Sequence, residues 1–130
     1  MKHLFLAAAL VAATFCTAIA GERPSKAENE AAMKAGRKVL AVKVSELEKD
    51  INSHNAKASG TALDVLKLMQ NGLYQSSVAI SYQAAPQQKT ANQSYNKMEM
   101  VVYEYKNLTK DVSGNGKQLV DHAHTFLKQY

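Results

Sequence analysis

The residues best suited to chemistry are two histidines near the end of the chain. The last residues read QLVDHAHTFLKQY, so His122 and His124 are separated by a single position. Imidazole nitrogens bind transition metals and haem iron, and they transfer protons near neutral pH. On a strand this spacing would place both rings on one face, but on a helix the two rings point ~200° apart. A helical pair cannot chelate one ion alone, so any site needs ligands from other elements.

Common catalytic motifs are absent from the sequence. It contains no phosphate-binding loop, no H-E-x-x-H motif and no Glu-x-x-His pair of the kind that builds di-iron sites in helical bundles. Asp121 precedes His122, but adjacent residues of a helix do not face each other. We therefore expect a protein that is not an enzyme.

The first twenty residues have the three parts of a secretory signal peptide. A positively charged start is followed by an apolar run, and the triplet AIA forms a cleavage site before Gly21. The apolar run is too short to span a membrane, and a membrane anchor is the alternative interpretation. We predict a signal peptide at residues 1–20, one mature domain at residues 21–130 without a membrane span, and a periplasmic location.

The composition of the mature domain excludes several classes of protein. The only cysteine of the chain, Cys16, leaves with the signal peptide, so disulfides, thiolate metal sites and covalent c-type haem are excluded. Removing Lys2 leaves 15 Lys and Arg against 11 Asp and Glu in the mature domain. These charges are scattered, and there is no basic stripe with interleaved aromatic residues to indicate a nucleic-acid partner.

Apolar residues recur every three or four positions through the mature domain, which predicts helices rather than strands. The first helical segment opens at Ser25, whose side chain can cap the helix while Glu28 reaches back in a capping box. The segment ends in the polar stretch NSHNAKASG. Its apolar stripe, which falls within roughly 40° of one line, consists of Met33, Leu40, Val44, Leu47 and Ile51.

Three further helical segments follow. The second starts near Thr61 and ends before Pro86. The third runs from about Pro86 or Thr90 to Asp111, the sequence DVSGNGK then breaks the chain, and a shorter fourth segment begins at Lys117. The second segment carries, at spacings of three and four, Leu63, Leu66, Met69, Leu73, Ser77 and Ile80. The apolar stripes of the third and fourth segments are Tyr95, Met98, Val101, Val102, Tyr105, Leu108 and Val112; and Leu119, Val120, Ala123, Phe126, Leu127 and Tyr130.

Four helices with short loops predict an all-α fold, an up-down-up-down antiparallel four-helix bundle. Gly72 interrupts the second helix, and a close contact between helices would explain it. The first and last helices are then neighbours, so Met33, His122 and His124 reach nearly the same level at ~1.5 Å per residue. A methionine and a histidine that face each other inside a bundle are axial ligands suited to low-spin haem.

Over its whole mature length the chain resembles the soluble cytochrome b562 family. The features that match are ENEAAMKAGRKVL in the first helix, the proline break QAAPQQ, the start GNGKQL and the end HTFLKQY of the fourth helix. The resemblance implies a periplasmic b-type cytochrome that holds haem b non-covalently and passes electrons to a redox partner protein. It implies Met33 and a histidine of the fourth helix as iron ligands. The tail match favours His124, and the apolar face does not distinguish it from His122.

A bundle that binds no haem is the second hypothesis. It would act in the cell envelope as a protein-interaction, stress or chaperone-like module, and the tyrosines of the chain would suit an interface. Glycosylation triplets begin at Asn92 and Asn107, which would fit a secreted eukaryotic protein. A visible absorption spectrum separates the haem-binding hypothesis from the haem-free one.

Overall fold

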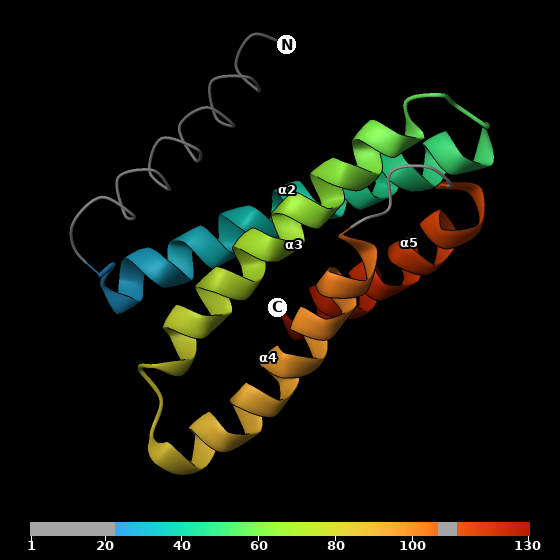
Figure 1. Cartoon of the computed structure of the whole chain (residues 1–130). Coiled ribbons are helices and arrows are strands. Elements are labelled where there is room, and N and C mark those ends of the chain that lie inside the picture. The colour runs from blue at the N-terminus through green and yellow to red at the C-terminus, as the bar shows by residue number, and fades with distance from the viewer. Residues whose placement is uncertain (1–22, 107–111) are drawn as a thin grey trace, which may run out of the picture.

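The computed structural model describes residues 23–106 and 112–130, and within them the chain forms four helices and no strand. The helices are α2 (Lys26–Asn52), α3 (Ala58–Ile80), α4 (Ala85–Tyr105) and α5 (Val112–Gln129), shown in Figure 1. The prediction of an all-helical bundle is confirmed for this part of the chain. The predicted signal peptide and the expected end of the third helix near Asp111 lie outside the described residues.

The start of α2 is fixed by the predicted capping box. The Ser25 amide donates to the Glu28 carboxylate at 2.8 Å, and the Ser25 hydroxyl accepts from the Glu28 amide at 3.2 Å. The bond from the Ser25 amide, together with the Ser25 side chain, holds the pKa of the Glu28 carboxyl below its usual value. These bonds satisfy amide groups that have no acceptor inside the helix.

α3 starts at Ala58, earlier than the start near Thr61 that the sequence predicts. The turn before it is closed by Asn55, whose side chain accepts from the Lys57 amide and whose carbonyl accepts from the Ala58 amide, both at 3.0 Å. The Thr61 hydroxyl instead donates to the Asp50 carboxylate at 2.7 Å. Thr61 therefore joins α3 to α2, and the prediction that the helix begins there is wrong.

α5 starts at Val112 rather than at Lys117, so the prediction of a chain break over the glycines is wrong. Gly116 lies buried within the helix. A glycine costs ~1 kcal/mol in a helix relative to alanine, which lowers helix propensity without preventing a helix. The apolar residues further along α5 are buried in the core, and packing of this kind outweighs local propensity.

Hydrogen bonds at two levels of the bundle show how α2 and α3 run. Asn29, near the start of α2, bonds to the carbonyl of Gln75, near the end of α3. Asp50, near the end of α2, bonds to Thr61, near the start of α3. The two helices therefore run in opposite directions, and Figure 1 shows the same for α4 and α5.

In cross-section the four helices form a diamond. α3 and α5 each contact all the other helices, whereas α2 and α4 do not approach each other within the described residues. α3 and α5 therefore lie on the short diagonal, and α5 stands between α2 and α4 (Figure 1). α5 lies between α2 and α4 only along its own length.

The core lies where all four helices overlap. Burial of each large apolar side chain there contributes on the order of 2 kcal/mol. Leu63 was expected on the apolar stripe of α3 but is 44% exposed, because it lies ~120° around the helix from the buried Met69. The largest fully buried apolar side chains are Phe126, Leu40, Leu47, Met69, Leu119, Val44 and Val65.

Candidate functional site

Two aromatic rings at the end of α5 occupy a notch made by glycines. Phe126 and Tyr130 have ring centroids 5.2 Å apart. A Cβ atom at Gly72 of α3 would lie 2.8 Å from the Phe126 ring and 3.2 Å from the Tyr130 ring. A Cβ atom at Gly36 of α2 would lie 3.0 Å from the Tyr130 hydroxyl. Gly72 is therefore explained by a close contact between helices, and burial in the notch raises the pKa of Tyr130 to about 12.

The notch marks a boundary along the bundle because α5 ends there. On α2 and α3 the boundary is given by Gly36 and Gly72. On α4 it follows from Tyr105, whose hydroxyl bonds to Gln118 of α5 at 3.3 Å. Since the two helices run in opposite directions, the end of α5 lies about ten residues back along α4, near Tyr95.

The other three helices continue past this boundary, and we call that region the open end: residues 26–35 of α2, 73–80 of α3 and 85–94 of α4. At ~1.5 Å per residue the parts of α2 and α4 in it are each ~15 Å long. Among the described residues no helix stands between α2 and α4 in this region, and the two helices do not contact each other. In Figure 1 the C-terminus lies midway along the bundle, and the starts of α2 and α4 diverge beyond it.

The inner face of α4 changes character at the boundary. The buried residues in the second half of the helix are Met98, Val102 and Tyr105. In the first half the same face, within roughly 40° of Met98, carries Gln87, Ala91 and Ser94. An apolar face that packs in the core thus continues as a face of neutral polar and small residues.

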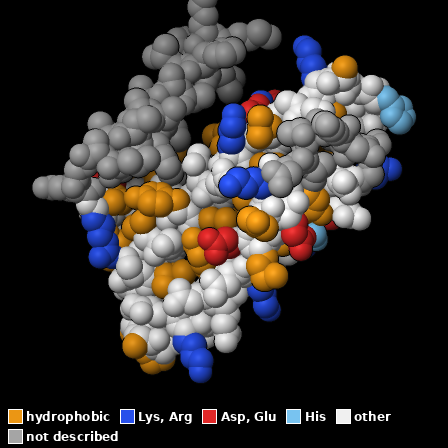
Figure 2. Space-filling model, viewed as in Figure 1, with side chains coloured by type: hydrophobic (Ala, Val, Ile, Leu, Met, Phe, Trp, Pro, Cys, Tyr) orange, Lys and Arg blue, Asp and Glu red, His pale blue; other side chains and the backbone are white. Residues whose placement is uncertain are grey.

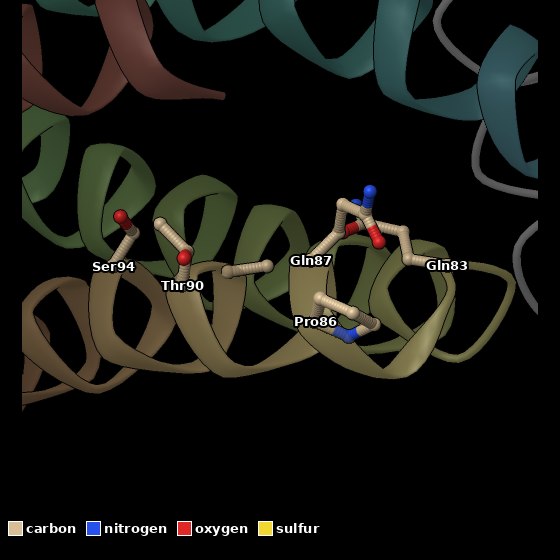
Figure 3. A pocket seen from close by; sticks show the side chains of 6 residues that line it. Gln83, Pro86, Gln87, Thr90 and Ser94 are labelled. Carbon is tan, nitrogen blue, oxygen red and sulfur yellow. The ribbon is translucent and has the colours of Figure 1, made fainter.

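This face lines a hollow of about 530 Å³. In Figure 3 the side chains of Gln87, Thr90 and Ser94 rise from α4 toward the gap that α2 borders on the far side. The volume falls within the ~300–1,000 Å³ of ligand pockets, but one helix and the turn before it supply the whole lining. An open, elongated surface of this kind suits another helix better than an enclosed small molecule. Its six lining residues, none of them charged, are Gln83, Pro86, Gln87, Thr90, Ala91 and Ser94.

The interior between α2 and α3 is also polar at the open end. Asn29 is 1% exposed and Gln75 is 5% exposed, at positions where the rest of the bundle has aliphatic residues. The Asn29 amide group donates to the Gln75 carbonyl at 3.3 Å and to the Met33 sulfur at 3.5 Å. The side-chain oxygens of Asn29 and Gln75 accept no hydrogen bond from the described chain. An acceptor that stays buried without a partner costs about 1–3 kcal/mol.

Side-chain contacts tie the start of α2 to the turn after α3. The Tyr82 hydroxyl donates to the Pro24 carbonyl, and the Arg23 guanidinium bonds to the Ser81 hydroxyl. Arg23 also lies 4.4 Å from the centre of the Tyr82 ring. These contacts hold the start of α2 to the end of α3. Figure 2 shows that the tip where α3 turns into α4 presents mainly neutral polar surface with few charged side chains.

The structure does not bring Met33 together with the histidines of α5. Met33 is half-buried in the open end, whereas His122 packs edge-on against Tyr105 with 5.6 Å between ring centroids, and His124 is exposed. Tyr130 marks the boundary. Met33 lies on its open-end side, and His122 and His124 lie on its core side. Along the bundle axis the offset from Met33 is roughly 14 Å to His124 and roughly 17 Å to His122.

These positions do not fit a haem held by Met33 and a histidine of α5. Two axial ligands must face each other across a single iron atom, which this offset does not allow. The expectation that the three residues share one level assumed that α2 and α5 end together. In the structure α5 ends level with Gly36, ten residues after the first residue of α2. The Nδ1 atom of His122 is buried without a hydrogen bond to the described residues, but it lies on the α4 side of the helix.

Within residues 23–106 and 112–130, no group of three His, Cys, Asp or Glu side chains could hold a metal ion. No helix in the same ranges is long and apolar enough to cross a membrane. Comparisons of the chain with protein-family models, with curated proteins and with solved structures found no match. The role of the open end must therefore be inferred from its own geometry.

One feature of the sequence indicates the open end, although the apolar stripes do not. Gln87, Thr90 and Ser94 of α4 follow each other at spacings of three and four, as residues on one face of a helix do, and Gln83 lies in the turn before the helix. These residues belong to no apolar stripe because they are polar. A polar stripe in register with an apolar one indicates that a helix leaves the core partway along its length.

Proposed function

We propose that the protein is a non-catalytic helical bundle of the cell envelope that binds a helix of a partner protein at its open end. In this proposal residues 1–20 export the chain, and residues 21–130 form an up-down-up-down antiparallel bundle. The observation that carries it is the hollow on the inner face of α4, whose lining holds no charged residue. A helix of about ten residues is ~15 Å long, which is enough to lie along residues 85–94 of α4.

The residues that line the hollow support a helical partner with a neutral face. Helices bind in grooves through residues spaced three and four apart, which matches the spacing on α4. Gln87 offers both a donor and an acceptor, and Thr90 and Ser94 offer hydroxyls. A strongly charged partner would meet no opposite charge among the residues that line the hollow.

Photo-crosslinking in cells tests the proposal. A photoreactive amino acid is placed at Thr90, which lines the hollow, or at Gln93, which is exposed on the outer side of the same helix. We expect a defined protein adduct from the Thr90 position and none from Gln93. Equal labelling from the two positions, or none from Thr90, would contradict a binding role for the open end.

The cytochrome hypothesis is tested separately, by titration of the purified protein with haemin. Because Met33 and the α5 histidines are offset along the bundle, we expect no saturable one-to-one Soret shift and no low-spin bands on reduction. A saturable shift that is lost in Met33→Ala and in His122→Ala or His124→Ala would establish haem binding and overturn the haem-free proposal.

A further inference from the structure

We infer that the start of α2 is a strap that opens from α3 as a unit and is fastened by Tyr82. The strap comprises residues 23–35, which are the first ten residues of α2 and the three residues before it. The inference does not depend on the proposed function. It rests on how the strap is buried, on how it is fastened and on the glycine that follows it.

The strap is buried through an amide and not through apolar side chains. Of the residues of α2, all of which the structure describes, only Asn29 is buried before Leu40, and the later ones are Leu40, Val44, Leu47 and Ile51. Asn29 bonds to the Gln75 carbonyl at 3.3 Å, whereas the four aliphatic residues belong to the core. Because burial of apolar surface is the main favourable term in folding, opening the strap costs less free energy than unfolding the rest of the helix.

Tyr82, in the turn after α3, fastens the strap through two parts of its side chain. Its hydroxyl donates to the Pro24 carbonyl, and the centre of its ring lies 4.4 Å from the guanidinium carbon of Arg23. These contacts join residues far apart in the chain, so opening the strap breaks them. The capping box of Ser25 and Glu28 lies inside the strap and survives the opening, which lets the strap move as a helix.

Gly36 follows the strap directly and provides its hinge. A Cβ atom at Gly36 would lie 3.0 Å from the Tyr130 hydroxyl, so α2 is packed closely against α5 at this residue. Glycine favours a helix less than every other residue except proline, so α2 bends or unwinds more easily here than at the residues on either side. Opening about Gly36 would expose the side of α3 that carries Gln75, which is 5% exposed when the strap is closed.

Hydrogen exchange of the purified protein at urea concentrations below the unfolding transition tests the inference. Exchange at residues 30–35 should hardly depend on urea, because local opening exposes little surface, whereas exchange at residues 40–51 should speed up as urea rises. Tyr82→Phe removes the hydroxyl bond and should speed exchange at residues 30–35 about fivefold, and Tyr103→Phe, at a ring that is 75% exposed on α4, should not. Ile51→Val, in the core, should speed exchange at residues 40–51 about fivefold and leave residues 30–35 within about twofold. The same urea dependence in both segments, or no effect of Tyr82→Phe at residues 30–35, would overturn the inference.

Thiol labelling gives a second measurement of the same opening from the side of α3. In a Cys16→Ser background the chain has no other cysteine, so Gln75→Cys and Val65→Cys each introduce a single thiol at a buried position of α3. The thiol at position 75 should react through opening of the strap, about fivefold faster when Tyr82→Phe is added and at an unchanged rate when Ile51→Val is added. The thiol at position 65 lies in the core and should react faster with Ile51→Val. Equal responses of the two thiols to Ile51→Val would mean that the strap does not open separately from the core.

Discussion

The two ends of this bundle are built from the same helices but have different interiors. Where α5 is present, residues such as Leu40, Met69 and Phe126 are buried to 0–2% exposure. Beyond Tyr130 the interior holds Asn29 and Gln75, and the inner face of α4 is open. The difference shows that α5 determines where this chain has an apolar core. Among the described residues, α2 and α3 alone do not bury the inner face of α4, and the residues on this face are polar or small.

The largest expected effect lies in the core, where α5 packs against the other helices. Phe126→Ala removes a ring that is 2% exposed and that fills the notch beside Gly72, and should lower the free energy of unfolding by about 3–5 kcal/mol. Thr90→Ala, in the open end, should change it by less than about 0.5 kcal/mol. Urea denaturation measures both. Similar losses in the two variants would mean that the two ends are equally packed.

Two alanine substitutions in α3 test the boundary between the ends: one at Gly72 in the notch, and a control at Gly60 away from it. In Gly72→Ala the new methyl group lies 2.8 Å from the Phe126 ring, and overpacking of about 1–3 kcal/mol should exceed the ~1 kcal/mol gained in helix propensity. Gly60→Ala meets no atom within 4 Å and should stabilise the protein by up to about 1 kcal/mol. Thermal unfolding should therefore shift in opposite directions, and a stabilised Gly72→Ala would contradict the notch.

At the open end, local helix stabilisation should matter more than packing. Ser25→Ala removes the hydroxyl that accepts from the Glu28 amide, keeps the backbone amide that donates to the Glu28 carboxylate, and should cost about 1 kcal/mol. Ser45→Ala, at an exposed position inside the same helix, should change stability by less than about 0.5 kcal/mol. Hydrogen exchange of the first turn of α2 would show the loss locally. Unchanged exchange in Ser25→Ala would mean that tertiary contacts alone fix this end.

The smallest effect concerns the pH dependence of Tyr130. Burial raises the pKa of Tyr130 from 10.0 to about 12, so the unfolded chain loses this proton before the folded chain does. Between these values the folded state binds more protons, and the free energy of unfolding falls as pH rises. The Tyr130→Phe variant should show a shallower decline in this range, measured by urea midpoints against the parent protein. An identical decline in both would show that the hydroxyl is not held in the notch.

Most of the helical architecture could be predicted from the sequence, because it depends on interactions that are local in the chain. The capping box at Ser25 and Glu28 lies within one turn, and the apolar stripes follow the period of a single helix. The starts of α3 and α5 differ from the predicted ones because they depend on contacts between residues far apart in the chain. Thr61 is held by Asp50 of a different helix, and the glycines before Lys117 stay helical because residues further along α5 are buried.

The sequence by itself determined the four helical segments, their buried faces and the chain's neutral stripe on α4. The tertiary structure alone decided how far each helix extends past the others. That register depends on where Tyr130 fits between Gly36 and Gly72, a contact among three helices that no local pattern encodes. It separates Met33 from His122 and His124, and it turns the stripe on α4 from an interior face into an exposed one. Local periodicity gives the faces of helices, whereas only packing between distant residues gives their alignment.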